Sequence, residues 1–401
     1  MTARKSYVAL TMATLAFAAS FAAWSLLAPL ATQLQKQYHI GDFEISVLLA
    51  IPVILGSLAR IPMGFLTDRF GGRKVMSALL LFCVIPCLGM TTAASFEAFA
   101  FWGFLLGMAG SSFAVGVPFV SRFFGPEKQG LVVGVFGMGN IGTAIAARVA
   151  PEVSKANGWQ SAFVLFGVVV LVTAIAFFFL AGDEKRPATS TSMSQRLEIL
   201  KRERLTWLFS LFYFLTFGGF VAFGLYLPKL LVDLFGLDKV DAANRAAVFV
   251  LVATLARPVG GWLSDKISAT KVLTAVFAIV PAMAVVLAFQ PDIVILTVAF
   301  LVIAAMLGLG NGAVFKLVPQ YYSKEAGTVT GLVGAAGGLG GFFPPLVMGA
   351  FKTALGSYAL GYVLLAGVAV VCLVLNLAIL GKRNKHQKVQ SGGNDRTLNA
   401  A

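Results

Sequence analysis

Three basic residues lie inside long apolar stretches of the sequence, namely Arg60, Arg257 and Lys316. The 17 acidic residues all fall in the loops between these stretches or close to their ends. A guanidinium group presents a planar fork of donors that fits a planar oxyanion, and two facing guanidiniums repel each other unless an anion lies between them. These residue types favour a binding site for a small anion. The alternative is two independent arginines that each hydrogen-bond to backbone carbonyls and only support packing.

The two arginines occupy equivalent depths in their apolar stretches. Arg60 lies eight residues before Asp68, and Arg257 lies eight residues before Asp265. At about 1.5 Å per helical residue, each arginine is ~12 Å from the inner end of a helix, where the hydrocarbon half-thickness is about 15 Å. An arginine near the bilayer centre costs at least ~2.5–3.5 kcal/mol, so both side chains are expected to face a cavity and a partner.

Lys316 lies towards the inner half of the apolar stretch near 293–320. Its flexible stem could carry the ammonium group to the cytoplasmic surface. The side chain could instead line the inner exit path, or carry a transported proton, because buried lysines lose their proton readily. The sequence leaves these roles open.

The stretches that must position these residues fill the whole chain. Of 401 residues, 58% are hydrophobic and 12% charged, about half the charged share of a soluble domain, which excludes a soluble enzyme with one anchor. A spanning helix needs roughly 20 apolar residues. The sequence therefore predicts an all-α polytopic membrane protein with twelve transmembrane helices, near 7–34, 44–67, 74–93, 97–122, 130–150, 160–181, 205–235, 246–264, 270–290, 293–320, 327–353 and 357–381.

The basic residues are distributed unevenly between the two sides of this topology. With the N-terminus inside, 21 Lys and Arg residues fall on the inner side and 7 on the outer side, so orientation in a membrane explains why the chain is basic, with a net charge of +14. The positive-inside rule places both termini in the cytoplasm, and short loops without a targeting segment favour the cytoplasmic membrane of a prokaryote. No soluble basic patch suggests a nucleic-acid partner.

The chain repeats itself in two halves. The polar segment 182–204 separates a six-helix half, 1–181, from a second one, 205–381, and a tail at 382–401 is expected to be a disordered cytoplasmic segment. An offset of 197 residues relates Arg60 to Arg257 and Asp68 to Asp265. Duplicated halves are typical of secondary transporters, which bind their cargo between the repeats near the midplane.

The loop after the second stretch resembles a signature of the major facilitator superfamily. It reads Gly64-Phe65-Leu66-Thr67-Asp68-Arg69-Phe70-Gly71-Gly72-Arg73-Lys74, with one extra glycine before Arg73. The resemblance implies that Asp68 caps a neighbouring helix and helps to close the cytoplasmic face, together with Arg69, Arg73 and, in the second half, Asp265.

Two glycine-rich stretches, 130–143 and 327–341, are similar to the signature helices of the nitrate/nitrite porter family within that superfamily. Their signature glycines are Gly134, Gly137, Gly139, Gly142, Gly331, Gly334, Gly337 and Gly338. Glycine at three- and four-residue spacing lets helix backbones approach closely. The resemblance covers the chain except the segment 182–204 and the tail.

The resemblance also implies a set of site residues. Arg60 and Arg257 would grip the anion, Asn140 would contact it from the signature helix, and Tyr213 would donate a hydroxyl. Phe217 and Phe113 would form aromatic walls above and below a planar anion.

The expected function is alternating access of two rocking halves, with nitrate and nitrite as substrates and the lipid bilayer as surroundings. Exchange of nitrate for nitrite is favoured, because two arginines without a membrane carboxylate make the empty carrier costly to reorient. Proton-coupled nitrate symport through Lys316 is the alternative, followed by a carrier for another small anion or an organic acid. A channel would need a continuous pore, and a receptor a soluble output domain. No enzyme activity, catalytic residue, metal or cofactor is expected, and the chain is expected to work as a monomer.

Overall fold

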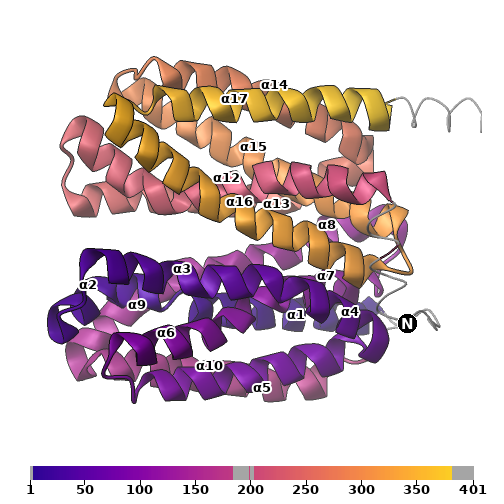
Figure 1. Ribbon diagram of the computed structural model, residues 1–401. Helices are drawn as coiled ribbons and strands as arrows, with labels where there is room; N and C mark the ends of the chain where they lie inside the picture. Colours follow the sequence, from indigo (N-terminus) through magenta and orange to yellow (C-terminus); the bar gives the residue numbers. More distant parts are fainter. Residues whose placement is uncertain (1–2, 184–197, 199–202, 382–401) are drawn as a thin grey trace, which may run out of the picture.

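The computed structural model describes residues 3–183, 198 and 203–381, and within that part every regular element is helical. Figure 1 shows the arrangement of the longer helices, which are α1 (Ala3–Trp24), α2 (Leu27–Tyr38), α3 (Asp42–Leu58), α4 (Arg60–Phe70), α5 (Gly72–Met90), α6 (Phe96–Leu106), α7 (Ser112–Ser121), α8 (Gln129–Gly137), α9 (Ile141–Asn157), α10 (Trp159–Leu180), α12 (Arg204–Phe235), α13 (Lys239–Leu263), α14 (Ala269–Ala288), α15 (Ile293–Tyr321), α16 (Ala326–Leu355) and α17 (Ala359–Leu375).

The described helices make twelve crossings of a membrane, as predicted. Eleven helical segments are long and apolar enough to span, and the longest, 241–288, contains 48 residues. A straight helix of that length would be about 72 Å long, more than twice the roughly 30 Å hydrocarbon thickness. Ser268 breaks it with a φ of 97°, at the end of a short π-helical segment, Ser264–Ser268. α13 and α14 are therefore two spans.

Four of the spans consist of two helices joined end to end: α1 with α2, α3 with α4, α6 with α7, and α8 with α9. The break between α8 and α9 is a 3-10 turn, Met138–Asn140, inside the glycine-rich signature stretch. The break between α3 and α4 falls directly before Arg60. Interruptions of this kind inside long helices often mark functional hinges.

The helices form two bundles that lie against each other (Figure 1), α1 to α10 in indigo to magenta and α12 to α17 in rose to yellow. Across the interface α4 packs on α16, and α8 packs on α13. Most of the predicted linker 182–204 and the whole predicted tail 382–401 lie outside the described residues.

Glycines allow the close approach of these crossing helices. A Cβ atom at Gly134 of α8 would lie 2.6 Å from the Cα of Pro258 in α13, and one at Gly331 of α16 would lie 2.4 Å from the carbonyl oxygen of Arg60 in α4. Real Cβ atoms do not approach backbone so closely, so any larger residue would force the two bundles apart. Both positions adjoin an arginine, so the same contacts that join the bundles also bring Arg60 and Arg257 to the interface.

Candidate functional site

Arg60 and Arg257 are both buried at the interface between the bundles. Arg60 begins α4 and Arg257 lies in α13, and each residue is 3% exposed. The Nη1 of Arg60 donates to the carbonyl of Gly334 in α16 at 2.5 Å, and the Nη1 of Arg257 donates to the carbonyl of Gly137 in α8 at 3.1 Å. Each guanidinium thus reaches the signature helix of the opposite bundle. These four residues are related by the same offset of 197.

The remaining contacts of the two guanidiniums differ. Arg60 donates through Nε to the carbonyl of Gly110 at 3.0 Å, whereas Arg257 donates through Nη2 to the hydroxyl of Tyr213 at 2.9 Å. In the described part of the chain neither guanidinium forms an ion pair. The contacts with carbonyls are those that a packing role would require, but they leave two buried positive charges without a protein counter-charge, which is costly at this depth.

A stack of aromatic rings lies beside both arginines. The ring centroid of Phe217 lies 5.4 Å from the Cζ of each arginine, and the ring of Phe113 lies 5.7 Å from that of Arg257. Tyr213 stacks on Phe217 with centroids 4.9 Å apart and planes at 5°, and it stacks on Phe113 at 6.0 Å and 10°. The flat faces of these rings attract the cations at such distances. The structure therefore brings the predicted aromatic residues together with both arginines.

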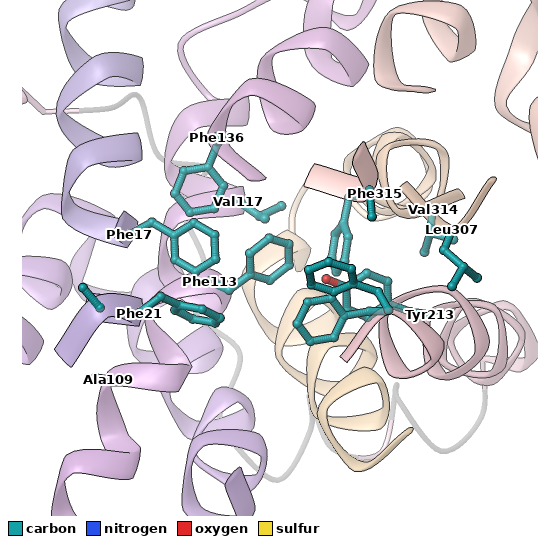
Figure 2. Close-up of a cluster of buried hydrophobic side chains, with 14 of the residues drawn as sticks. Phe17, Phe21, Ala109, Phe113, Val117, Phe136, Tyr213, Leu307, Val314 and Phe315 are labelled. Carbon is teal, nitrogen blue, oxygen red and sulfur yellow. The ribbon is translucent and has the colours of Figure 1, made fainter. Parts of the chain in front are cut away.

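Phe315 of α15 completes this aromatic group, and sequence reasoning missed it. Its ring meets Tyr213 edge to face at 4.5 Å and Phe113 at 4.8 Å, and Figure 2 shows the three rings converging between the bundles. One signal was its position directly before Lys316, but 35 phenylalanines in the chain gave no means of choosing it.

Asn140 lies in the 3-10 turn between α8 and α9. The residue is 2% exposed, and neither its Oδ1 nor its Nδ2 has a hydrogen-bond partner in the described structure. An amide in this state has a donor and an acceptor available for a ligand. Asn140 is three residues beyond Gly137, whose carbonyl accepts from Arg257.

The signature glycines lie where the helices of the site touch. Those at 134, 137, 331 and 334 face Arg257 or Arg60, those at 139 and 142 face Phe17 and Ala18 of α1, and those at 337 and 338 face Tyr213 and Ser57. At seven of them an added Cβ would lie 3.1 Å or less from its nearest neighbour, and at Gly137 it would lie 3.4 Å from the side chain of Arg257.

Two aspartates cap helices of the opposite bundle. The carboxylate of Asp68 accepts from the backbone N–H groups of Gly327 and Thr328 at 3.1 and 2.9 Å, at the start of α16. The carboxylate of Asp265 accepts from those of Gly130 and Leu131 at 3.0 and 2.8 Å, at the start of α8. Negative charge at a helix N-terminus is favourable because the first N–H groups have no partner within the helix. Both bundles therefore use the same contact.

Each of these aspartates also has a basic partner on its own bundle. Arg122, which sequence reasoning missed, donates to Asp68 at 2.6 Å. Lys316 pairs with Asp265 at 2.7 Å, and its ammonium also donates to the carbonyl of Pro126 on the opposite bundle. Lys316 is 8% exposed, so of the roles that the sequence left open, extension of the ammonium to the cytoplasmic surface is the one that does not fit the structure. The lysine can form this ion pair because Asp265, although it lies at the end of a helix, is close to α15.

Arg69 and Arg73 make contacts within their own region of the chain. Arg73 pairs with Asp183 at 2.9 Å and lies over the ring of Phe178, both of which belong to the end of the first bundle. The guanidinium of Arg69 lies over the neighbouring Phe70. Among the predicted gate residues, Asp68 and Asp265 bridge the two bundles.

Comparison with known proteins agrees with this architecture. The family model of the Major Facilitator Superfamily matches residues 13–345 and 245–400. The nitrite extrusion protein of Bacillus subtilis (strain 168) is 41% identical, over 92% of this chain and 94% of its own. The probable nitrate transporter NarT of Staphylococcus carnosus (strain TM300) is 42% identical, over 96% of this chain and 99% of its own.

Solved structures show the same fold at low identity. The human organic anion transporter MFSD10 has a TM-score of 0.79 at 16% identity and covers 92% of this chain and 99% of its own. The transporter FucP in the outward conformation has a TM-score of 0.75 at 18% identity and covers 93% of this chain and 98% of its own. The chain is therefore a membrane transporter rather than an enzyme, and it belongs to the nitrate/nitrite porter family of the Major Facilitator Superfamily.

Proposed function

We propose that the chain carries nitrate and nitrite across the cytoplasmic membrane by alternating access and exchanges one anion for the other. The observation that carries the proposal is the pair of buried guanidiniums at the bundle interface. Both lie over the ring of Phe217, and neither has a carboxylate partner in the described structure. The names of the Bacillus and Staphylococcus relatives support the choice of nitrate and nitrite as cargo.

The shape of the site favours a small planar anion over an organic acid. The rings of Phe113, Tyr213 and Phe217 are stacked with nearly parallel planes, and each arginine lies near one or more of them. A flat oxyanion can lie against the face of such a ring while it accepts hydrogen bonds in its own plane from the guanidinium forks. In this arrangement the anion lies between the bundles and contacts groups from both.

Exchange follows from the charge of the site. The site must close around its two positive charges when the bundles rock from one side to the other, and without an anion these charges stay uncompensated inside the membrane. A bound anion lowers that cost in both directions, so return without cargo is slow. The coupling that results is obligatory exchange.

Proton symport is the second candidate, and it would require a group that loads and releases a proton near the site. Lys316 is the residue that the sequence offers for this role, but its ammonium is engaged by Asp265 and the carbonyl of Pro126. These contacts favour a role for this lysine in holding the two bundles together. Exchange therefore remains the favoured mechanism over symport.

Counterflow in proteoliposomes tests the proposal. Purified protein is reconstituted with nitrite, nitrate or no anion inside, and labelled nitrate is added outside without a pH gradient. We expect uptake only into vesicles that are preloaded with nitrate or nitrite. Uptake into unloaded vesicles that rises with an inward proton gradient would replace exchange with symport. The absence of nitrate uptake under every condition would remove nitrate as the cargo.

A further inference from the structure

Asn311 of α15 is a second buried amide without a protein partner. The residue is 2% exposed, and neither Oδ1 nor Nδ2 forms a hydrogen bond in the described structure. Buried polar side chains in membrane proteins are normally satisfied, because lipid offers no hydrogen bonds. The chain itself gives the contrast, since the Nδ2 of the buried Asn376 donates to the carbonyl of Thr270 and the hydroxyl of Thr274. A packing role explains Asn376 but leaves Asn311 unexplained.

The helix geometry turns Asn311 towards the aromatic group of the site. Leu307 and Phe315 stand four residues before and after it, and residues four apart share one face of a helix. The ring of Phe315 packs edge to face on Tyr213, and the side chain of Leu307 faces Gly219 of the same helix, α12. Figure 2 shows the side chain of Phe315 close to Tyr213, and Leu307 on the same side of the view. The amide of Asn311, midway between them, therefore faces the same region.

The height of Asn311 along α15 matches that of the arginine site. A Cβ at Gly308 would meet Ala256 of α13, and a Cβ at Gly312 would meet the backbone carbonyl of Arg257. A Cβ at Gly310 would meet the side chain of Thr216, next to Phe217 in α12. The turn of α15 that carries Asn311 therefore lies at the same height as Arg257 in α13 and Phe217 in α12.

We propose that Asn311 is a further substrate-contact residue, whose Nδ2 donates to the transported oxyanion. This rests on the proposed function of the site. The site then has one arginine and one amide from each bundle: Arg60 and Asn140 from the first, Arg257 and Asn311 from the second. A neutral amide adds directional donors for the anion oxygens. A third positive charge would be repelled by the two close guanidiniums, and an amide avoids that repulsion.

The test compares anion affinity in variants of the full chain. Nitrate binding is measured from the thermal stabilisation of purified protein over a nitrate titration, and KM and Vmax are measured in counterflow. Loss of one hydrogen bond to a charged ligand predicts that Asn311→Leu weakens nitrate binding and raises KM by about 10- to 100-fold, with a smaller effect on Vmax. The matched control is Asn376→Leu, which removes a partnered amide and should lower thermal stability without changing nitrate affinity.

The outcomes separate this inference from the proposed function. If the wild-type protein binds no nitrate, the proposed function fails first. If the wild type binds nitrate and Asn311→Leu binds it with the same affinity, the role of Asn311 is overturned while the arginine site stands. Should the leucine variant not fold, Asn311→Ala removes the same amide with less bulk, and the same two results decide.

Discussion

At the scale of the residue, the two arginines supply the site with hydrogen bonds and ring contacts as well as positive charge. Arg60 holds two backbone carbonyls, one in each bundle, while its Cζ lies over the ring of Phe217. Only a planar group with several fixed donors can hold these partners, stack on a ring and still contact an anion. A lysine ammonium is a compact point charge and would have to give up most of these contacts.

Arg60→Lys and Arg257→Lys should each lower nitrate exchange by about 10-fold or more, because each loses charge-assisted hydrogen bonds of about 1.5–3 kcal/mol apiece while retaining the charge. The measurement is the initial rate of labelled nitrate uptake by counterflow, normalised to the amount of reconstituted protein. Arg148→Lys is the matched control, because Arg148 is exposed and pairs with Glu152 one turn away. Near-normal uptake in either site variant would contradict the two-arginine site.

The sequence predicts the depth of a side chain along its helix, but it does not predict how that helix is rotated against its neighbours. Residue numbers give the depth of a side chain along the axis, so the equal depths of Arg60 and Arg257 could be predicted. They do not give the rotation of one helix against another. The pair of Lys316 with Asp265 needed that rotation, because the two residues lie on α15 and on the segment that follows α13. Phe315 was missed for the same reason.

At the scale of the element, two helix N-termini join the bundles. α16 begins against Asp68 and α8 begins against Asp265, so each bundle supplies a carboxylate to the other. Lys316 adds a second link beside α8, because it bonds both Asp265 and the carbonyl of Pro126 just before α8. These links must break whenever the bundles separate at this face. We infer that they set the stability of the closed state.

Lys316→Gln should therefore loosen the start of α8 selectively. Removing one member of a buried ion pair leaves the other charge uncompensated, which costs about 3–5 kcal/mol in other proteins. Hydrogen–deuterium exchange should become at least several-fold faster at the amides of Gly130 and Leu131, which Asp265 caps. The amides of Gly327 and Thr328, which Asp68 caps, provide the internal control and should not change. Equal exchange at both helix starts would remove Lys316 from the closing contact.

The same variant also tests proton coupling. If Lys316 only closes the face, the pH dependence of nitrate uptake should keep the shape of the wild-type profile while the rate changes at all pH values. A profile that loses its pH dependence in Lys316→Gln would make the lysine a proton carrier and would favour symport.

At the scale of the whole molecule, one offset of 197 residues describes the sequence repeat and the contacts between the bundles. It relates the two arginines, the two carbonyls that they reach and the two capping aspartates. Hydropathy was sufficient to predict the twelve spans because a bilayer demands long apolar helices. It could not predict the break at Met138–Asn140 or the packing of α4 on α16, which depend on tertiary contacts.

The distribution of basic residues predicts the orientation of the whole molecule, and cysteine labelling can test it. The native cysteines Cys83, Cys87 and Cys372 are buried, so a cysteine introduced at an exposed position should dominate the reaction with a membrane-impermeant maleimide. Lys36→Cys and Lys128→Cys provide exposed probes at the predicted outer and inner ends.

With both termini in the cytoplasm, the cysteine at 36 should react in intact cells. The one at 128 should react only after the cells are made permeable, because basic loops are retained on the cytoplasmic side. The opposite pattern would invert the topology. It would then place the face closed by Asp68, Asp265 and Lys316 on the outside, and the exchange cycle would have to begin from the other side of the membrane.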